Sequence, residues 1–338
     1  MVSVILIWIY MLFTCYVPGF TALGLLSGKE RQIRSESGCL YAGIVIVTVY
    51  AQFFSLFHKV GLAANLLLLL LCAACLFVRG RQMAEHIRGV LLTVTPARAG
   101  AAVFLFFLFA YGTSTGIIHY DTGLYHAQSI RWIEEYGVVP GLGNLHSRLA
   151  YNSASFCLSA LYSFAFLGGR SFHACAGFLA WLLAMVCAQG VFGRKGSKPV
   201  LSDLVRVMGV YYLLNIFDEM VSPASDYFMV LLAFCILIRW MDLLEEGVRD
   251  IFPYGMLCVM GVFLMTVKLS AALILLLVFY PAYYLLKERR WKETGIYLAL
   301  GIVTALPFFI RNVLLSGWLV YPFTRIDLFD VKWKIPKG

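Results

Sequence analysis

Long apolar runs recur along the whole chain of 338 residues and are separated by short polar segments. The hydrocarbon core of a bilayer is about 30 Å thick, so an α-helix needs roughly 17–25 apolar residues to cross it. The leucine-rich run at 62–78 has that length, whereas a β-barrel would show short alternating stretches. Backbone groups in lipid must also be satisfied within their own segment. The pattern therefore predicts an all-α, polytopic transmembrane helix bundle.

We expect about 10–11 membrane segments in a single integral-membrane domain that covers residues 1–338. The first run lacks the basic leading region of a signal peptide and is too long for its core, so we predict a retained helix. The segments 151–167 and 171–192 are counted as one crossing plus a half-helix, with a break at Gly168-Gly169. The predicted spans are 2–26, 38–57, 60–78, 101–118, 151–167 with 171–192, 200–216, 227–241, 252–267, 269–286 and 295–310.

Basic residues cluster in four of the loops between these spans. Cytoplasmic loops carry an excess of Lys and Arg, so the four loops are predicted to face the cytoplasm. The stretch 119–150, the turn 217–226, Lys268 and the tail 311–338 then share the extracytoplasmic face of a plasma or inner membrane. The clusters are Lys29/Arg31/Arg34, Arg79/Arg81/Arg88/Arg98, Arg194/Lys195/Lys198 and Lys287/Arg289/Arg290/Lys292.

Composition supports the membrane interpretation and excludes two other classes. Hydrophobic residues make up 61% of the chain and charged residues 13%, whereas soluble domains carry about 25% charged residues. The net charge of +9 could indicate nucleic-acid binding, but the basic residues lie in short clusters between apolar runs. We therefore predict membrane lipid, and no nucleic acid, as their partner. Cys72 and Cys75 form a CxxC without a second ligand pair, so no metal site is predicted there.

The stretch 119–150 is the only loop before the tail that is long enough to hold a site. Within it Tyr125, Trp132 and Tyr136 are spaced by seven and four residues, which predicts an amphipathic helix on the membrane surface. Gly137 is expected to end this helix. Asp121 then lies where the preceding span emerges and the surface helix begins.

Asp121 has two interpretations, and the sequence leaves both open. As a helix N-cap, its carboxylate would satisfy unpaired backbone N–H groups. As a general base, it would act with polar neighbours in the same loop, where a carboxylate at a membrane boundary is a plausible proton acceptor. His119 and His126 are seven residues apart, which fits no strong metal motif. No metal is predicted, and a divalent cofactor is left open. The neighbours are His119, Tyr120, His126, Arg131, His146 and Arg148.

Three further charged residues lie at predicted membrane borders. Ser222 and Pro223 are expected to begin a helix, which places Asp226 in its first turns as a carboxylate either favoured by the helix dipole or functional. Lys268 could snorkel to the headgroups or bind an anionic group. Arg311 could hold a phosphate or anchor its helix.

These features together resemble the bacterial GT-C-fold membrane glycosyltransferases over about residues 112–323. They are an Asp in the first large outer loop, a second Asp after Ser-Pro, a lysine before a leucine-rich span, and the closing RNVLLSGWLVYPF. The loop YDTGLYHAQSIRWIEEYGVVPGLGNLHSRLAYNSASF is similar to that of a branch of bacterial membrane proteins related to this superfamily. The resemblance implies a GT-C-like fold with Asp121 as the catalytic base. It also implies substrate or phosphate binding by Asp226, Lys268, Arg311, His126, Arg131, Arg148 and Tyr321.

The function expected from this resemblance is transfer of a sugar from a polyprenyl-phosphate lipid donor to a cell-envelope acceptor, either glycan or lipid, outside the cytoplasm. A transporter or flippase is one alternative, although it would place charges in mid-membrane within paired repeats, and the sequence has no internal repeat. A polysaccharide polymerase is another. Because the chain ends at Gly338, soon after YPF, a C-terminally truncated, inactive relative is a third.

Overall fold

The computed structural model describes residues 1–27, 36–193 and 200–337, and every regular element in these ranges is a helix. The α-helices are α1 (Val2–Leu26), α2 (Glu36–Ser55), α3 (Leu62–Thr93), α4 (Pro96–Thr115), α5 (Ala127–Tyr136), α6 (Ala154–Leu161), α7 (Cys175–Gly193), α8 (Leu201–Asn215), α9 (Ser225–Glu245), α10 (Ile251–Val267), α11 (Phe279–Lys287) and α12 (Trp291–Ser316). The 3₁₀- and π-helical segments are η1 (Thr122–His126), η2 (Leu142–Asn144), η3 (Ser147–Ala150), η4 (Ala165–Leu167) and η5 (Leu269–Val278). The all-α prediction is confirmed. The basic clusters at Lys29/Arg31/Arg34 and Arg194/Lys195/Lys198 lie outside the described residues.

Seven helices in the described ranges are long and apolar enough to cross a membrane, namely α1, α2, α3, α4, α9, the continuous segment η5–α11, and α12. Three shorter apolar helical segments, at 154–167, 175–190 and 251–267, accompany them. The protein is therefore a multi-pass helical membrane protein. The number of 10–11 segments and the GT-C-like arrangement stay predictions.

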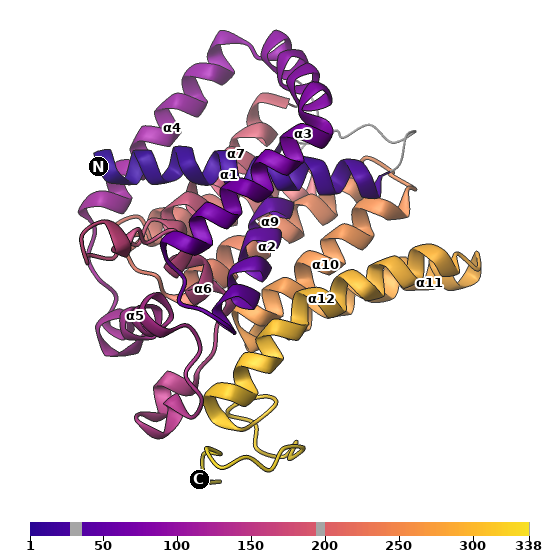
Figure 1. Cartoon of the computed structure of the whole chain (residues 1–338). Coiled ribbons are helices and arrows are strands. Elements are labelled where there is room, and N and C mark those ends of the chain that lie inside the picture. Colours follow the sequence, from indigo (N-terminus) through magenta and orange to yellow (C-terminus); the bar gives the residue numbers. More distant parts are fainter. Residues whose placement is uncertain (28–35, 194–199, 338) are drawn as a thin grey trace.

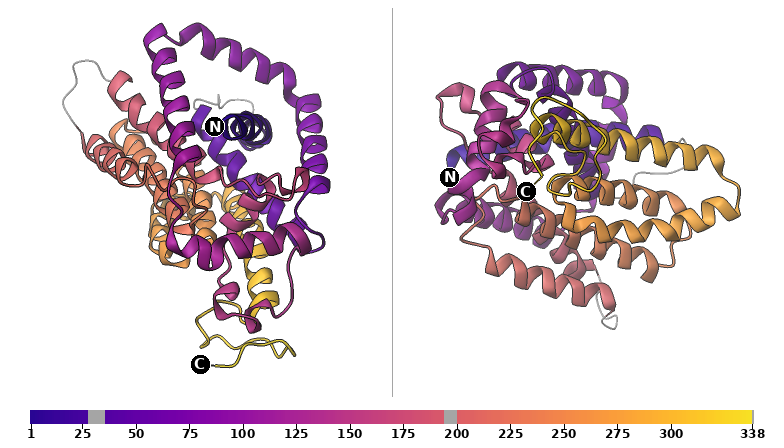
Figure 2. Two further views of the ribbon diagram at one scale, coloured as in Figure 1. Left: turned by 90° about the vertical axis from the view of Figure 1, so that its left-hand side faces the viewer. Right: turned by 90° about the horizontal axis from the view of Figure 1, so that it is seen from below.

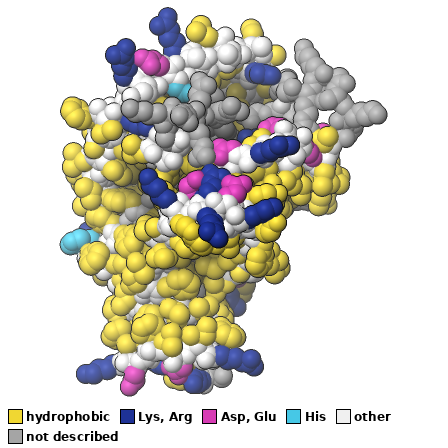
Figure 3. All heavy atoms as spheres, turned by 90° about the vertical axis from the view of Figure 1, so that its right-hand side faces the viewer, with side chains coloured by type: hydrophobic (Ala, Val, Ile, Leu, Met, Phe, Trp, Pro, Cys, Tyr) yellow, Lys and Arg dark blue, Asp and Glu magenta, His cyan; other side chains and the backbone are white. Residues whose placement is uncertain are grey.

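The surface carries the apolar side chains that such a protein presents to lipid. Phe77 on α3 is 93% exposed, and Leu214 on α8 and Ile302 on α12 are also exposed. Figure 3 shows a broad band of hydrophobic side chains between charged groups in the upper half and a second charged group at the lower end. A contiguous apolar surface of this extent would be unstable in water.

The bundle is built around a close crossing of α1 and α2. A Cβ atom on Gly43 would overlap the carbonyl oxygen of Cys15, and one on Gly19 would overlap that of Cys39. Small residues at such crossings let helix backbones approach closely in membranes. Figure 2, left, shows α1 end-on beneath an arch formed by α3 and α4.

We expect Gly43→Ala to destabilise the protein by about 1–3 kcal/mol, because the added methyl group meets backbone atoms that cannot rotate away. The measurement is the thermal unfolding midpoint in detergent. Gly89→Ala on α3 is the matched control, because no atom outside its own helix lies within 4 Å of the added carbon and alanine favours a helix. Equal midpoints for Gly43→Ala and wild type would contradict the packing argument.

Two boundaries clarify the sequence predictions. Helix α3 continues to Thr93, well past the predicted end at residue 78, because 79–93 contains no proline and is rich in helix-forming residues. An Arg81–Glu85 ion pair of 3.0 Å supports this extension. Helix α6 has eight residues, about 12 Å of length, which agrees with the predicted half-helix before Gly168-Gly169.

One end of the bundle gathers segments that are far apart in the chain. The Ile117 N–H donates to the carbonyl of Asp218 at 2.5 Å, and the Asn144 side chain donates to the carbonyl of Trp333 at 2.7 Å. In Figure 1, α5, the end of α12 and the C-terminal tail all lie toward the bottom of the view. The stretch 119–150, the turn 217–226 and the tail therefore share one end, as predicted, and its extracytoplasmic orientation stays a prediction.

Candidate functional site

The site begins with the surface helix that the sequence predicts. The π-helical turn η1 runs without interruption into α5, which ends at Gly137 with φ +80°, a conformation that favours glycine. The helix and its end at Gly137 are where the sequence predicts them, and its position on the membrane surface stays a prediction. A π-helical turn is rare, and such turns occur frequently at functional sites. This one sets the positions of Tyr125 and His126.

Asp121 immediately precedes the π-helical turn and does not act as its cap. Its carboxylate accepts no capping hydrogen bond from the described residues, so the N-cap interpretation is wrong. Instead its Oδ1 atom accepts a long hydrogen bond of 3.4 Å from Arg148 Nη1. The Asp121 side chain is 34% exposed, so the carboxylate remains reachable from outside.

Asp226 and Lys268 form a second ion pair at the same end. Asp226 lies in the first turn of α9, as predicted. The helix starts at Ser225, however, and not at the predicted Ser222-Pro223, because the Ser222 hydroxyl accepts the backbone N–H of His119 at 2.7 Å. The Lys268 ammonium, at the junction of α10 and η5, contacts the Asp226 carboxylate.

Tyr125 and His126 lie within electrostatic reach of both pairs. Burial, together with the charges of Asp121 and Asp226, raises the pKa of Tyr125 to about 12. Burial lowers the pKa of His126 to about 4, against the opposing effect of the same two aspartates. We refer to Asp121, Arg148, Asp226, Lys268 and His126 as the two-aspartate cluster.

An aromatic row extends the cluster toward the tail. The ring of Tyr151 lies 6.2 Å from that of Tyr125 and 5.5 Å from that of Tyr321, and the Arg148 guanidinium lies 5.8 Å from the Tyr125 ring. Burial raises the pKa of Tyr321. Sequence reasoning did not single out Tyr151, because it opens an apolar run. Its only local signal is its position three residues after Arg148.

Arg311 is placed differently from the sequence expectation. It is 2% exposed and donates to Ser55 Oγ at 2.5 Å and to Asn152 Oδ1 at 3.2 Å. These contacts hold the guanidinium inside the bundle, beside a cavity of about 10 Å³ that Tyr151 also lines. A cavity of this size suits one water molecule. Phosphate binding by Arg311 stays a prediction that requires movement of the side chain.

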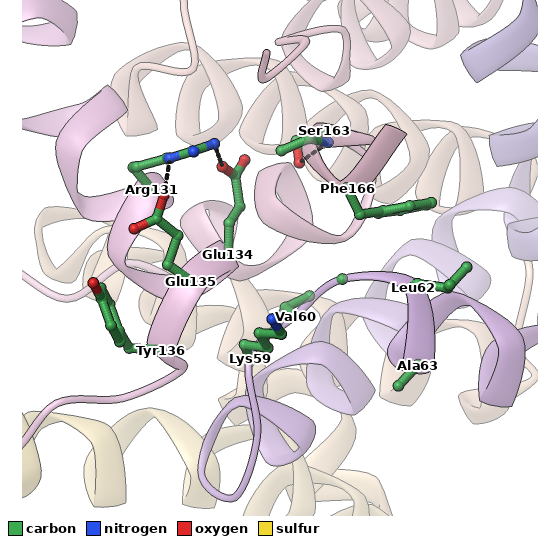
Figure 4. Close-up of a pocket in the computed structure, with 12 residues that line it drawn as sticks. Lys59, Val60, Leu62, Ala63, Arg131, Glu134, Glu135, Tyr136, Ser163 and Phe166 are labelled. Atoms are coloured by element: carbon green, nitrogen blue, oxygen red, sulfur yellow. Dashed lines mark hydrogen bonds and ion pairs between the residues drawn. The ribbon is translucent and has the colours of Figure 1, made fainter. Parts of the chain in front are cut away.

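Arg131 points away from the two-aspartate cluster. Its Nε atom lies 2.5 Å from Glu135 Oε1, and its Nη1 atom donates to Glu134 Oε2 at 3.3 Å and to the carbonyl of Gly169 at 3.0 Å. Figure 4 shows Arg131 between the two glutamates at the edge of a separate pocket. The structure therefore brings six of the predicted site residues to one end of the bundle, linked by ion pairs, by ring contacts or by electrostatic reach of Tyr125 and His126. Arg131 and Arg311 have their polar partners elsewhere.

The model of a family described as a domain of unknown function (DUF8201) matches residues 1–338. The chain belongs to this family. No curated protein and no solved structure matches it. For this DUF8201 member, chemical roles must be argued from its own geometry. In the described ranges, no group of three or more His, Cys, Asp or Glu side chains has the arrangement of a metal site.

His126 predicts acid sensitivity. The ring is fully buried, and neither nitrogen has a hydrogen-bond partner among the described residues. Because its pKa falls from 6.5 to about 4 on folding, the unfolded state gains a proton first as the pH falls. The free energy of unfolding is therefore highest above pH 6.5, where the His126 ring is neutral in both states, and it falls as the pH drops toward 4. We expect the free energy of unfolding to fall by about 1–2 kcal/mol between pH 6.5 and 5.

The unfolding midpoint across this pH range measures the effect. His126→Phe should remove most of the pH dependence, whereas His58→Phe, at an exposed histidine, should retain it. A His126→Phe profile as steep as that of wild type would show that other groups cause the sensitivity.

Proposed function

We propose that this protein is a membrane-embedded glycosyltransferase that moves a sugar from a polyprenyl-phosphate-type lipid to a cell-envelope acceptor. Its main support is the meeting of two half-exposed ion pairs, Asp121–Arg148 and Asp226–Lys268, at one end of an apolar bundle. The four residues come from segments separated by up to 147 positions. An anionic lipid headgroup beside the apolar belt would meet both cations there.

Asp121 is the proposed general base. Its contact with Arg148 is long and partly exposed, so an acceptor hydroxyl can replace the arginine as its partner. The carboxylate takes the hydroxyl proton while the acceptor oxygen forms a bond to the anomeric carbon. The bond from that carbon to the donor phosphate oxygen breaks, and its electron pair leaves with the lipid phosphate. The proton on Asp121 is then lost to water.

Lys268 and Arg148 are the proposed partners of the departing phosphate. Both are reachable, whereas Arg311 is enclosed. Cations held in place before the reaction stabilise charge that develops in the transition state. Asp226 orients Lys268 through their ion pair. His126 is neutral at pH 7 and packs against Tyr125 and Phe156 at 4.2 and 5.4 Å between ring centres.

A transporter or flippase is less well supported. Such proteins bind their substrates near the bilayer midplane, at broken helices, whereas both ion pairs of the cluster lie where helices begin or end. These positions favour chemistry at the membrane surface over passage through the bundle.

The test uses purified protein in lipid bilayers, radiolabelled polyprenyl-phosphate sugars and a cell-envelope extract as acceptor. Transfer of label into the extract is the expected result. Movement of intact labelled lipid across the bilayer without transfer would instead indicate a flippase. If neither transfer nor lipid movement occurs with any donor tested, the proposal is contradicted.

A further inference from the structure

A second pocket of about 580 Å³ lies on the other side of α5 from the small cavity at Arg311. It is bounded by the start of α3, by α5 and by η4 (Figure 4). This volume is within the range of about 300–1,000 Å³ typical of small-ligand sites. The lining residues used below are Lys59, Leu62, Arg131, Glu134, Tyr136 and Phe166.

Glu134 provides an acceptor atom that no described residue uses. The residue is 7% exposed. Its Oε2 atom accepts from Ser171 Oγ at 2.7 Å and from Arg131 at 3.3 Å, whereas Oε1 is buried without a hydrogen-bond partner among the described residues. A buried acceptor left unpaired is unfavourable. A ligand hydroxyl in the pocket would satisfy Oε1 once the Glu134 side chain turns this atom toward it.

Charge balance in the pocket favours a neutral ligand. Two cations, Arg131 and Lys59, and two carboxylates, Glu134 and Glu135, line it. Arg131 already contacts both carboxylates. An ammonium group that approached Glu134 would meet this guanidinium and be repelled. A hydroxyl group can donate to Glu134 without that penalty, and a second hydroxyl can accept from the exposed Lys59.

The remaining wall is apolar and partly aromatic. Leu62, Tyr136 and Phe166 are exposed at the pocket. A sugar ring presents hydroxyl groups around its edge and C–H groups on its faces, which matches a wall of this kind next to isolated polar groups. Alkyl or acyl chains would leave Glu134 Oε1 unpaired.

We propose that this pocket binds a neutral, hydroxyl-rich glycan. If the proposed function holds, on which this step rests, the glycan is part of the acceptor. Glu134 follows Asp121 by thirteen positions along η1 and α5, which corresponds to roughly 20 Å of helix. The acceptor is therefore an oligosaccharide of several residues, with one part in the pocket and its reactive hydroxyl at Asp121.

The test is saturation-transfer NMR and titration of the detergent-purified full chain with maltotetraose and chitotetraose as neutral probes. Ethanolamine phosphate is the zwitterionic probe. We expect at least one neutral probe to bind. Phe166→Ala and Lys59→Gln should each weaken that binding at least tenfold without changing the unfolding midpoint, because both residues are exposed. Glu134→Gln should weaken it as well, and Glu85→Gln, an exposed glutamate on α3, is the control.

Binding that is unchanged in Phe166→Ala and Lys59→Gln, or binding of ethanolamine phosphate alone, would overturn the inference, and so would binding of none of the probes. Glycan binding without sugar transfer would support the glycan site and contradict the proposed glycosyltransferase function. Sugar transfer that the pocket variants leave unchanged, without glycan binding, would support the transferase function and contradict the glycan site.

Discussion

Asp121→Asn is expected to lower sugar transfer by about 10²–10⁴-fold, the usual contribution of a positioned general base. An amide has almost the same shape as the carboxylate, but it cannot take the proton from the acceptor hydroxyl. The rate of label transfer from a polyprenyl-phosphate sugar in lipid bilayers measures the effect. Because the Asp121 side chain is partly exposed and caps no helix, the fold should tolerate the change.

Asp218→Asn is the matched control, because Asp218 is an exposed aspartate at the same end of the bundle and belongs to neither ion pair of the cluster. It should transfer sugar at the wild-type rate. Full activity of Asp121→Asn would remove Asp121 from the mechanism and leave Asp226 as the remaining carboxylate of the cluster. Equal losses in both variants would indicate a general effect of charge.

Arg206→Met is expected to destabilise the protein by about 3–5 kcal/mol, because it removes the guanidinium that pairs with the buried Asp242 carboxylate. Arg206 Nη2 donates to both carboxylate oxygens of Asp242, at 2.8 and 2.7 Å, and this pair joins α8 to α9. Arg206 Nη1 donates to Ser202 Oγ, which in turn donates to Glu245 Oε2 at 2.6 Å. Thermal unfolding in detergent should show the loss as a lower midpoint.

The double variant Arg206→Met/Asp242→Leu should recover most of the lost stability, because apolar side chains of similar volume can replace a buried ion pair. Arg81→Met, which breaks the exposed pair with Glu85 on α3, should cost less than about 1 kcal/mol. A stability of Arg206→Met equal to that of Arg81→Met would show that the α8–α9 pair is not a structural clamp.

Local pattern was sufficient for the elements of the fold. A run of apolar residues in lipid has few alternatives to a helix, because each backbone group must be satisfied within its own segment. The same reasoning located α5, since the spacing of Trp132 and Tyr136 and the glycine at 137 are properties of a short stretch. The predicted break at Gly168-Gly169 does not set the length of α6, because this helix already ends at Leu161 and η4 lies between.

Where a helix begins, and how buried each site residue is, depended on contacts with residues from elsewhere in the chain. Ser222 looked like a cap, but it contacts His119, which lies 103 positions earlier. The sequence predicted Arg311 at the membrane border, but its hydrogen bonds to Ser55 and Asn152 hold it inside the bundle. A single charged residue in a sequence carries no information about which distant groups will satisfy it.

The sequence by itself determined that this chain is a helical membrane protein with a polar segment around Asp121. Periodicity and length are local properties, and the membrane restricts what they can mean. Only the tertiary structure decided that Asp121 and Asp226 both lie within electrostatic reach of His126, that Arg131 lies at a separate pocket, and that Glu134 Oε1 is buried without a hydrogen-bond partner among the described residues. Those outcomes depend on how helices pack, because packing brings together charges that lie more than a hundred positions apart.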